Sequence, residues 1–422
     1  MSRVKSVILD NGIRLFVHGD KTMKKCSVSF TVDYGHKGEY YKFNYKGKDY
    51  EVLPGCAHFL EHMLLEQSRY GNLYSYFKEL NYNANACTSL DYTKYYFTGI
   101  KRIKSSIYKL IDAIENPIFD SKAVRKSSPA IEEETKIFDN NAELQAILLS
   151  LRNSYSSFDY QHEVSLNPIG NEETTKSLDY DTLKLCYDAF YSDDRKIITI
   201  VGPIDEDDMI NYIKNIYKKI PNHKNETKLK IPTDLVSIRK KEDVLAKKIV
   251  ESDLLIINYK QFIKGYSIFE IRSFLNFISE YKFSNKTKFY EKEKNEGTLL
   301  FYYGNDIFNI FTNDLDDAFI MQFGFYTANK DKMLNDFEKE FKINNFEERD
   351  FELYKKAWIS RVLIADEDKY NFYSGLPINI IFYREYIDFV DCIKKLSYDR
   401  FIEFYNSLKL DNRVITLLTK EG

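Results

Sequence analysis

The sequence predicts an α+β fold of two homologous domains, each an antiparallel-rich sheet packed against helices. Three observations lead to this fold class. Residues 1–34 alternate apolar and polar side chains as strands do, for example in CSVSFTVDYG. Segments with helical spacing of apolar residues follow, among them residues 55–67 and 102–116. A helix, a polar turn and a buried strand then occur twice, at 177–202 and at 395–420.

The two repeated segments align without gaps. Identical residues occur at equivalent positions of the helix, the turn and the strand. The identical pairs are Leu178/Leu396, Tyr180/Tyr398, Asp181/Asp399, Tyr187/Tyr405, Asp193/Asp411, Arg195/Arg413 and Ile197/Ile415. The alignment favours an internal duplication. Chance similarity between two helix–strand units is the alternative.

A polar segment without periodicity separates the two predicted domains. Residues 218–243 carry Pro221 and Pro232 and show neither strand nor helix spacing, which is typical of a linker. We therefore predict an N-terminal domain at 1–217, a hinge at 218–243 and a C-terminal domain at 244–422. Within the first domain, residues 102–116 and 122–152 predict helices, with breaks expected at Asn116–Pro117 and Ser128–Pro129.

Composition excludes several classes of protein. The 422 residues are 44% hydrophobic and 30% charged, with a net charge of −3, which fits a globular chain and provides no basic surface for nucleic acid. No apolar run approaches the ~18 residues that a membrane-spanning helix needs. Five cysteines at wide spacing, without a CxxC pair, indicate a reducing compartment, so the cytoplasm is the expected location.

The most informative stretch is AHFLEHMLLE, residues 57–66. On a helix, His58 and His62 share one face, and Glu61 lies close to it. Two imidazoles one turn apart can bind one metal ion, and a neighbouring carboxylate can act on a water bound there. This donor set favours zinc, with a third protein ligand supplied from elsewhere in the chain.

Two histidines on an exposed helix face, with an acid nearby, are the alternative to a metal site. The residues around them argue against that alternative, because Phe59, Leu60 and Met63 predict a buried helix. Buried imidazoles need partners, and a metal ion provides one. The order HxxEH is the metalloprotease motif HExxH reversed.

Further segments occur in the same order as in a known family: NGIRLFV, GCAHFLEHMLLE, NANACTS, YYFTGI, NPIFD and AIEEETKIFDNN. With them the chain resembles the pitrilysin/insulinase family of zinc peptidases, the inverzincins. It is most similar to the short two-domain branch that includes mitochondrial processing peptidase and bacterial (Firmicute) cytoplasmic relatives. The resemblance covers residues 7 to about 215 well, and the second half only in its general layout.

The resemblance implies roles for individual residues. His58 and His62 become the first two zinc ligands and Glu61 the general base. The third ligand becomes Glu134, in the stretch Glu134-Thr135-Lys136-Ile137-Phe138-Asp139-Asn140. Its neighbours Glu132 and Glu133 are the alternative candidates for the third ligand. If no metal is bound, the three glutamates are simply the solvent-exposed start of a helix.

One position departs from the family pattern. Members usually carry a second glutamate seven residues before the third ligand, where it supports the site from behind. This chain has Ser127 there. Outer partners tune the orientation and affinity of metal ligands, so the resemblance implies a weaker or slower site that keeps all its ligands.

A substrate strand is the next implication. NANACTS resembles the family's edge strand, whose backbone pairs with an extended peptide, with Asn85, Ala86, Cys87 and Thr88 as the pairing stretch. An ordinary edge strand with solvated backbone groups is the alternative. Cys87 has no activating neighbour in the sequence, so a packing role is expected rather than a nucleophilic one.

Together these features predict a zinc-dependent endopeptidase with one Zn²⁺ per chain, which cleaves short unstructured peptides or leader segments by metal-activated water. The resemblance implies that the two domains enclose part of a peptide chamber. It also implies a dimer with a chain of the same fold, either a homodimer or, as we favour, a heterodimer with a silent partner. The rival hypothesis is a non-catalytic structural or binding subunit of such a peptidase.

Overall fold

The computed structural model describes residues 4–118, 120–159, 164–224, 226–230, 234, 236–308, 319–367, 369–383 and 386–421. The chain forms two compact units, and each unit is assembled from three separate segments. The first unit comprises Met1–Lys136, Tyr160–Lys230 and Ile364–Ile387. The second unit comprises Ile137–Asp159, Ile231–Leu363 and Asp388–Gly422. Of the described helices, none is long and apolar enough to cross a bilayer.

The first unit is organised around a six-stranded sheet in which only the β2–β8 pair is parallel. Its strands, in spatial order, are β1 (Lys5–Ile8), β2 (Arg14–Gly19), β8 (Lys196–Gly202), β3 (Cys26–Val32), β7 (Thr93–Gly99) and β6 (Asn83–Thr88). The helices and turns of this unit are η1 (Gly38–Tyr41), α1 (Cys56–Glu66), α2 (Leu73–Glu79), α3 (Ile103–Glu115), α4 (Ser121–Asp139), α7 (Glu172–Ser177), α8 (Tyr180–Phe190), η2 (Asp193–Arg195), α9 (Glu206–Tyr217) and α14 (Lys369–Tyr383).

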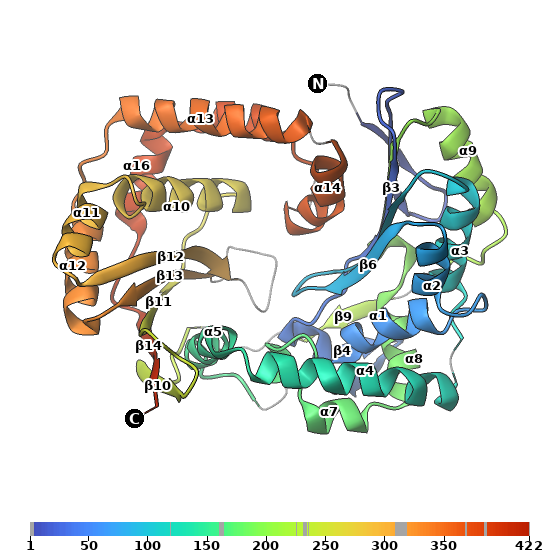
Figure 1. The fold of residues 1–422 in the computed structure, drawn as a ribbon, viewed down its shortest axis with the longest axis horizontal. Coiled ribbons are helices and arrows are strands. Elements are labelled where there is room, and N and C mark those ends of the chain that lie inside the picture. The colour runs from blue at the N-terminus through green and yellow to red at the C-terminus, as the bar shows by residue number, and fades with distance from the viewer. Residues whose placement is uncertain are drawn as a thin grey trace. The chain divides into compact units, whose positions relative to one another are not determined.

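Helices cover both faces of this sheet (Figure 1). Helices α1, α3 and α9 contact one face. The other face receives α14, whose Leu376, Ile380 and Ile381 pack against Phe16 and Ile197 in one buried cluster. A sheet buried on both faces explains why β8 is apolar along nearly its whole length, in the sequence KIITIVG.

A small second sheet joins the predicted hinge to the first unit. Strands β4 (Lys42–Tyr45) and β5 (Lys48–Glu51) form a hairpin whose two turn residues, Lys46 and Gly47, have φ of 51° and 81°. Positive φ at both turn positions suits the right-handed twist of a hairpin. Strand β9 (Thr227–Leu229) pairs with β4, so residues within 218–243 contribute a strand to this unit. The domain boundaries predicted from sequence stay a prediction.

The second unit has a five-stranded sheet and an aromatic core. In spatial order its strands are β10 (Glu242–Lys247), β14 (Arg413–Lys420), β11 (Leu254–Gln261), β13 (Phe319–Thr327) and β12 (Leu299–Phe308). Its helices are α5 (Ala142–Asn153), α10 (Ile268–Lys282), α11 (Lys288–Asn295), α12 (Lys330–Lys342), α13 (Glu348–Glu367), α15 (Phe389–Lys395) and α16 (Tyr398–Ser407).

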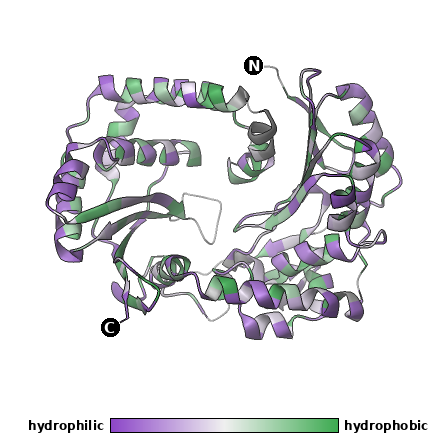
Figure 2. Cartoon of the chain, viewed as in Figure 1, coloured by the Kyte–Doolittle hydropathy of each residue, from purple (hydrophilic) through white to green (hydrophobic). Residues whose placement is uncertain are grey.

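Aromatic rings fill the space between this sheet and its helices. Phe283 alone lies against Phe289, Phe323, Phe325 and Phe337, with ring centroids 4.8–6.2 Å apart. The abundance of Phe and Tyr in the sequence is therefore used largely for core packing. Figure 2 shows strands β12 and β13 mainly in green, whereas outer helices such as α9 and α12 carry much more purple.

The two sheets share one topology, which confirms the α+β class and supports the predicted duplication. In both, one neighbour runs parallel to the repeat strand (β2 to β8, β10 to β14), and three antiparallel strands follow on the other side; the first sheet has the additional edge strand β1. The parallel pairs also begin alike: Arg14, the first residue of β2, lies opposite Ile197, and Glu242, the first residue of β10, lies opposite Ile415.

Each unit also contains one helix from the other half of the sequence. Helix α5 packs on β11 and β14 through Ala142, Ala146, Leu254 and Leu418. A polar network fixes it further, because Asn258 and Gln322 of the second sheet both donate to Ser150 Oγ at 3.1 and 3.2 Å. Helix α14, from the C-terminal half, contacts the corresponding strands of the first sheet, β8 and β3.

The break predicted at Ser128–Pro129 is wrong. Helix α4 runs through Pro129 to Asp139, and the chain breaks instead before Asn141, which caps α5. A proline within a helix removes one backbone donor. Next to Pro129, the Ser128 hydroxyl donates to the Val124 carbonyl at 3.0 Å. The uninterrupted helix places Glu134 two turns after Ser127.

The segment after β3 is held tightly against the β6–β7 turn. The amides of His36 and Lys37 donate to the carbonyls of Ser89 and Leu90, both at 3.1 Å. A Cβ on Gly35 would lie 2.2 Å from the Ser89 oxygen, so only glycine allows this approach. His36 is buried, and its Nδ1–H donates to the Ser165 carbonyl at 2.8 Å. Burial lowers the pKa of His36 to about 4, and the bond to Ser165 offsets only part of that effect.

A buried ion cluster lies near the start of β8. Lys196 Nζ is 2.5 Å from Glu115 Oε2 and 3.1 Å from Asp193 Oδ1, and all three side chains are at most 3% exposed. Tyr217 donates to the second oxygen of Glu115 at 2.8 Å. The cluster ties β8 to the ends of α3 and α9.

Acidification is expected to destabilise the first unit through His36. The pKa of His36 is lower in the folded chain than the value of 6.5 expected in the unfolded chain. Between pH 6.5 and 4, His36 is therefore protonated in the unfolded chain but neutral in the folded chain. Stability then falls by about 2 kcal/mol between pH 7 and pH 5 from this group alone. Thermal unfolding at both pH values should show a smaller loss for His36→Gln than for the wild type. Equal losses would contradict this assignment.

Replacing Lys196 should damage stability strongly. The change Lys196→Met leaves Glu115 and Asp193 buried without a counter-charge, which costs about 3–5 kcal/mol. The matched control is Lys5→Met, because Lys5 lies 2.5 Å from Asp207 in an exposed pair, and its loss should change little. Urea unfolding of both variants measures the difference, and similar midpoints would refute the role of burial.

Candidate metal centre

Helix α1, which carries both histidines, is buried on almost every side. Gly55 precedes it with φ of 97°, and a Cβ there would meet the Ile169 carbonyl oxygen at 2.5 Å. The glycine therefore lets the chain turn into the interior. The residues buried along the helix are Cys56, Ala57, His58, Phe59, Leu60, Glu61, Met63, Leu64 and Leu65. Its polar side chains consequently need partners from the surrounding elements.

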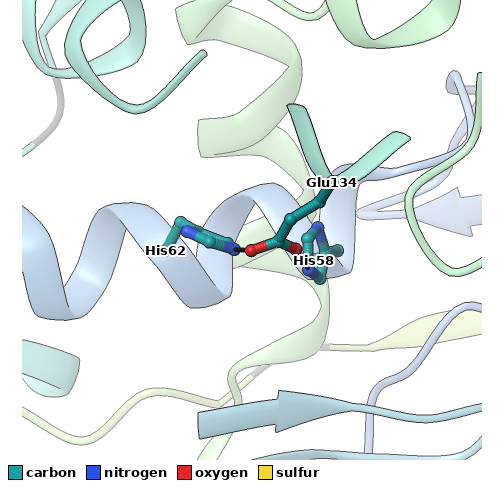
Figure 3. A group of neighbouring side chains, drawn as sticks. All are labelled: His58, His62 and Glu134. Atoms are coloured by element: carbon teal, nitrogen blue, oxygen red, sulfur yellow. Dashed lines mark ion pairs between the residues drawn. The ribbon is translucent and has the colours of Figure 1, made fainter. Parts of the chain in front are cut away.

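Three of the predicted residues come together. Glu134, from α4, places its carboxylate between the two imidazoles of α1 (Figure 3). His58 Nε2 lies 3.3 Å from one carboxylate oxygen and His62 Nε2 lies 3.7 Å from the other. Both histidines thus present the same ring nitrogen to the same group. Glu133, by contrast, is exposed and pairs with Lys136 at 2.6 Å.

The residues of this cluster shift one another's pKa values. Burial lowers the pKa of His62, but hydrogen bonds to Glu134 and Glu66 outweigh it and raise that pKa to about 10. The histidines in turn hold the pKa of Glu134 far below its usual range, through hydrogen bonds from His58 and His62. A carboxylate that stays ionised between two imidazoles is a ready ligand for a cation.

The donor set fits a zinc ion. The ligand atoms of His58, His62 and Glu134 all lie within 4.8 Å of one another. Two imidazole nitrogens and one carboxylate oxygen match the ligand set of catalytic zinc sites, which leave a fourth position for water. Among the residues that the structure describes, this is the one group of three histidine, cysteine or acidic side chains whose ligand atoms lie this close together.

Glu61 lies beside this cluster and is held by a hydrogen bond from another element. It is 5% exposed, and the Thr88 hydroxyl donates to its Oε2 at 2.7 Å. Burial raises the pKa of Glu61, and the neighbouring His58 and the bond from Thr88 act against that rise. A buried carboxylate with raised pKa is a better proton acceptor than an exposed one.

The predicted pairing stretch forms the edge of the first sheet. In β6, Asn85, Ala86, Cys87 and Thr88 pair with β7, and no described strand pairs with the outer edge. The Ser89 amide donates to the Tyr92 carbonyl. By the alternation of antiparallel bonds, the backbone groups of Ala86 and Thr88 then point to the open side. Burial raises the pKa of Cys87, which agrees with a packing role.

Sequence reasoning missed two contacts at the site. Thr88 was expected only to pair with substrate, yet its hydroxyl holds Glu61. Glu66 was not singled out, yet it accepts from His62 Nδ1 at 3.1 Å. The spacing of Glu66 four residues after His62 was a usable signal, because such residues face each other on a helix. The Thr88 contact links a strand to a helix and has no local signal.

Comparison with known proteins agrees with this geometry. Residues 16–164 match the family described as Insulinase (Peptidase family M16), and residues 177–357 match its companion, the Peptidase M16 inactive domain. The chain belongs to the insulinase family of peptidases. The HxxEH motif and Glu134 fall within the first matched region, and the second sheet falls mostly within the region described as inactive.

Curated relatives in the insulinase family come from bacteria and from eukaryotes. The chain is 29% identical over 213 residues to the uncharacterized zinc protease YmfH of Bacillus subtilis, covering 50% of this chain and 49% of that protein. It is 23% identical over 240 residues to the mitochondrial-processing peptidase subunit beta of Saccharomyces cerevisiae, covering 53% of this chain and 46% of that subunit. The chain thus spans about half the length of the curated relatives it matches.

Solved structures share the insulinase-family fold along the whole chain. An M16-like peptidase from Alicyclobacillus acidocaldarius superposes with a TM-score of 0.87 at 19% identity, covering 99% of this chain and 98% of that one. A protease from Helicobacter pylori superposes with a TM-score of 0.78 at 15% identity, with 99% coverage of both. At these identities the likeness supports the two-domain fold.

Zinc binding should depend on Glu134 and not on its neighbour. We expect the wild type to bind about one zinc per chain and Glu134→Ala to lose stoichiometric binding, because one of three ligands is gone. The matched control is Glu133→Ala, an exposed glutamate one position earlier on the same helix. Metal analysis after dialysis against micromolar zinc measures both. Equal zinc contents in the two variants would remove Glu134 from the site.

Proposed function

We propose that this chain is a zinc-dependent endopeptidase that cleaves short unstructured peptides or leader segments. The observation that supports the proposal is the convergence of His58, His62 and Glu134, with the buried Glu61 beside them. A subunit without catalytic function would not need both a complete set of ligands and a positioned base. The names of relatives, several of them zinc proteases, agree with the proposal.

The proposed chemistry assigns a task to each residue. A zinc ion held by His58, His62 and Glu134 would polarise the scissile carbonyl and acidify a bound water. Glu61 would accept a proton from the attacking water and deliver it to the amine as the carbon–nitrogen bond breaks. Thr88 would keep the Glu61 carboxylate aimed while its charge changes. No side chain forms a covalent bond to the substrate in this scheme.

Substrate binding would use the open side of β6. An extended peptide adds to a sheet edge through backbone hydrogen bonds, which are independent of its sequence. The small side chain of Ala86 and the short one of Thr88 leave room for such a strand. Since Thr88 also contacts Glu61, the bound peptide would lie next to the proton acceptor. Folded proteins rarely offer a free extended strand, so short unstructured peptides are the proposed substrates.

A second chain of the same fold is the proposed partner. Mitochondrial processing peptidase, to whose beta subunit this chain is similar, is named as a protein of subunits. We propose that this chain is the zinc-bearing member of a dimer, and we favour a heterodimer with a silent partner. Cleavage assays should accordingly be run with and without a candidate partner chain of the same family.

The variant Glu61→Gln tests the proposed chemistry. The amide keeps the size of the carboxylate but cannot accept the proton, so cleavage should fall by roughly 10²–10⁴-fold while zinc content stays unchanged. Fluorogenic peptides of varied sequence, with products identified by mass spectrometry, measure the rate. Glu79→Gln, an exposed glutamate at the end of α2, is the control. Undiminished cleavage by Glu61→Gln would rule out the role of Glu61.

A further inference from the structure

A third carboxylate supports the histidine helix from behind. Glu66 is the last residue of α1, and both of its oxygens are engaged. Its Oε1 lies 3.1 Å from His62 Nδ1, and its Oε2 accepts from the Ser127 hydroxyl at 3.0 Å. The side chains of Glu66 and His62 are only 17% and 13% exposed, and Ser127 is completely buried. These three residues form a continuous buried chain of hydrogen bonds, here named the back chain.

The ring of His62 has a carboxylate next to each of its two nitrogens. Nε2 faces Glu134 at 3.7 Å, and Nδ1 faces Glu66. A carboxylate accepts only, so Nδ1 carries the proton in this bond, and Nε2, which faces Glu134, is the nitrogen that can bind a metal ion. A histidine ligand whose other nitrogen donates to a carboxylate is oriented and made more basic.

The two histidines differ in this respect. His58 Nδ1 is buried and has no hydrogen-bond partner among the described residues. The ring of His62 alone is therefore held by a carboxylate behind it. A surface pair between residues four apart on a helix would be the simplest alternative. It does not explain why the second oxygen of Glu66 is bound by a completely buried serine on another helix.

Helix α4 contacts the histidine helix twice, on one face. Ser127 and Glu134 lie seven residues apart, two turns along α4. Glu134 meets the metal-facing nitrogens, and Ser127 meets the back of the same helix through Glu66. The serine at position 127 was expected from sequence to weaken the site, but its hydroxyl anchors a carboxylate that comes from α1 instead.

We propose that Glu66 is a positioning residue for the metal centre, held by Ser127, and that it orients His62 Nε2 toward the bound ion. The proposal rests on the metal site of the proposed function and deepens it. In this arrangement Glu66 would touch neither the ion nor the substrate. Its role acts through His62, so it should change how tightly and in what geometry a metal is held.

Metal affinity is the first readout. Zinc dissociation constants, measured by competition with a chromophoric chelator, should rise about 10–100-fold for Glu66→Ala. Ser127→Ala should raise them less, because Glu66 remains. The double variant should match Glu66→Ala alone, because Ser127 acts only through Glu66. Glu133→Ala is the control that should change nothing.

Cobalt substitution distinguishes a positioning role of Glu66 from a role in stability alone, because stability alone would not change the absorption spectrum of the bound metal. The visible absorption bands of bound Co²⁺ report the arrangement of its ligands. Glu66→Ala should shift these bands while the circular dichroism spectrum of the metal-free protein stays close to that of the wild type. If Glu66→Ala fails to fold, the isosteric Glu66→Gln replaces it, with a smaller expected loss of affinity, since its amide oxygen still accepts from Nδ1.

A relocated carboxylate provides a rescue test. In Glu66→Ala combined with Ser127→Glu, a carboxylate reaches from α4 into the space that the Glu66 side chain vacates. Zinc affinity and the cobalt spectrum should return at least partly toward the wild type. A role in packing alone predicts no such recovery, because the two substitutions differ in shape from the native pair.

The outcomes separate the two proposals. A wild type that binds one zinc, with unchanged affinity and cobalt spectrum in Glu66→Ala and Glu66→Gln, overturns the role of Glu66 and leaves the metal site intact. A wild type that binds no zinc or cobalt overturns both. Loss of zinc in Glu134→Ala together with a 10–100-fold weaker site in Glu66→Ala supports both.

Discussion

A buried helix that carries ionisable side chains requires a partner for each of them, and this requirement organises the first unit. Helix α1 is surrounded by the sheet and by other helices, yet it contains His58, Glu61, His62 and Glu66. Leaving such groups unpaired in the interior would cost several kcal/mol each. The surrounding elements supply Glu134 and Ser127 from α4 and Thr88 from β6. The same contacts that allow the helix to be buried also assemble the site.

Much of the site follows from local sequence, because its central feature is local. The i and i+4 spacing of His58 and His62 places both rings on one face of any helix, and the apolar neighbours predict burial. Glu134 lies 72 residues further along, and no periodicity could connect it to α1. It was found through the family resemblance, and the position of its helix depends on α4 running through Pro129, which the sequence rules for proline argued against.

The fold class was also predictable, whereas the exchange of helices was not. Alternating strands and the repeated helix–strand segment led to two similar α+β domains, and the shared arrangement of strands around the repeat strand agrees with that. The contributions of α5 and α14 to the opposite halves come from contacts between residues hundreds of positions apart. Amphipathic spacing indicates that a helix is half buried, but it does not indicate which sheet buries it. The strand β9 within the predicted hinge is a similar case, since three residues carry too little pattern to be recognised.

The exchange of helices has a consequence for how the protein is made. During synthesis the first sheet is complete once β8 has left the ribosome, but one of its faces stays uncovered until residues 369–383 emerge. At a typical rate of about 5–20 residues per second, that interval lasts on the order of ten seconds or longer. Phe16, Ile197 and Val201 remain exposed to solvent during this time. The nascent chain therefore presents an aggregation-prone apolar surface to which a chaperone could bind. Neither half of the coding sequence specifies a complete hydrophobic interior.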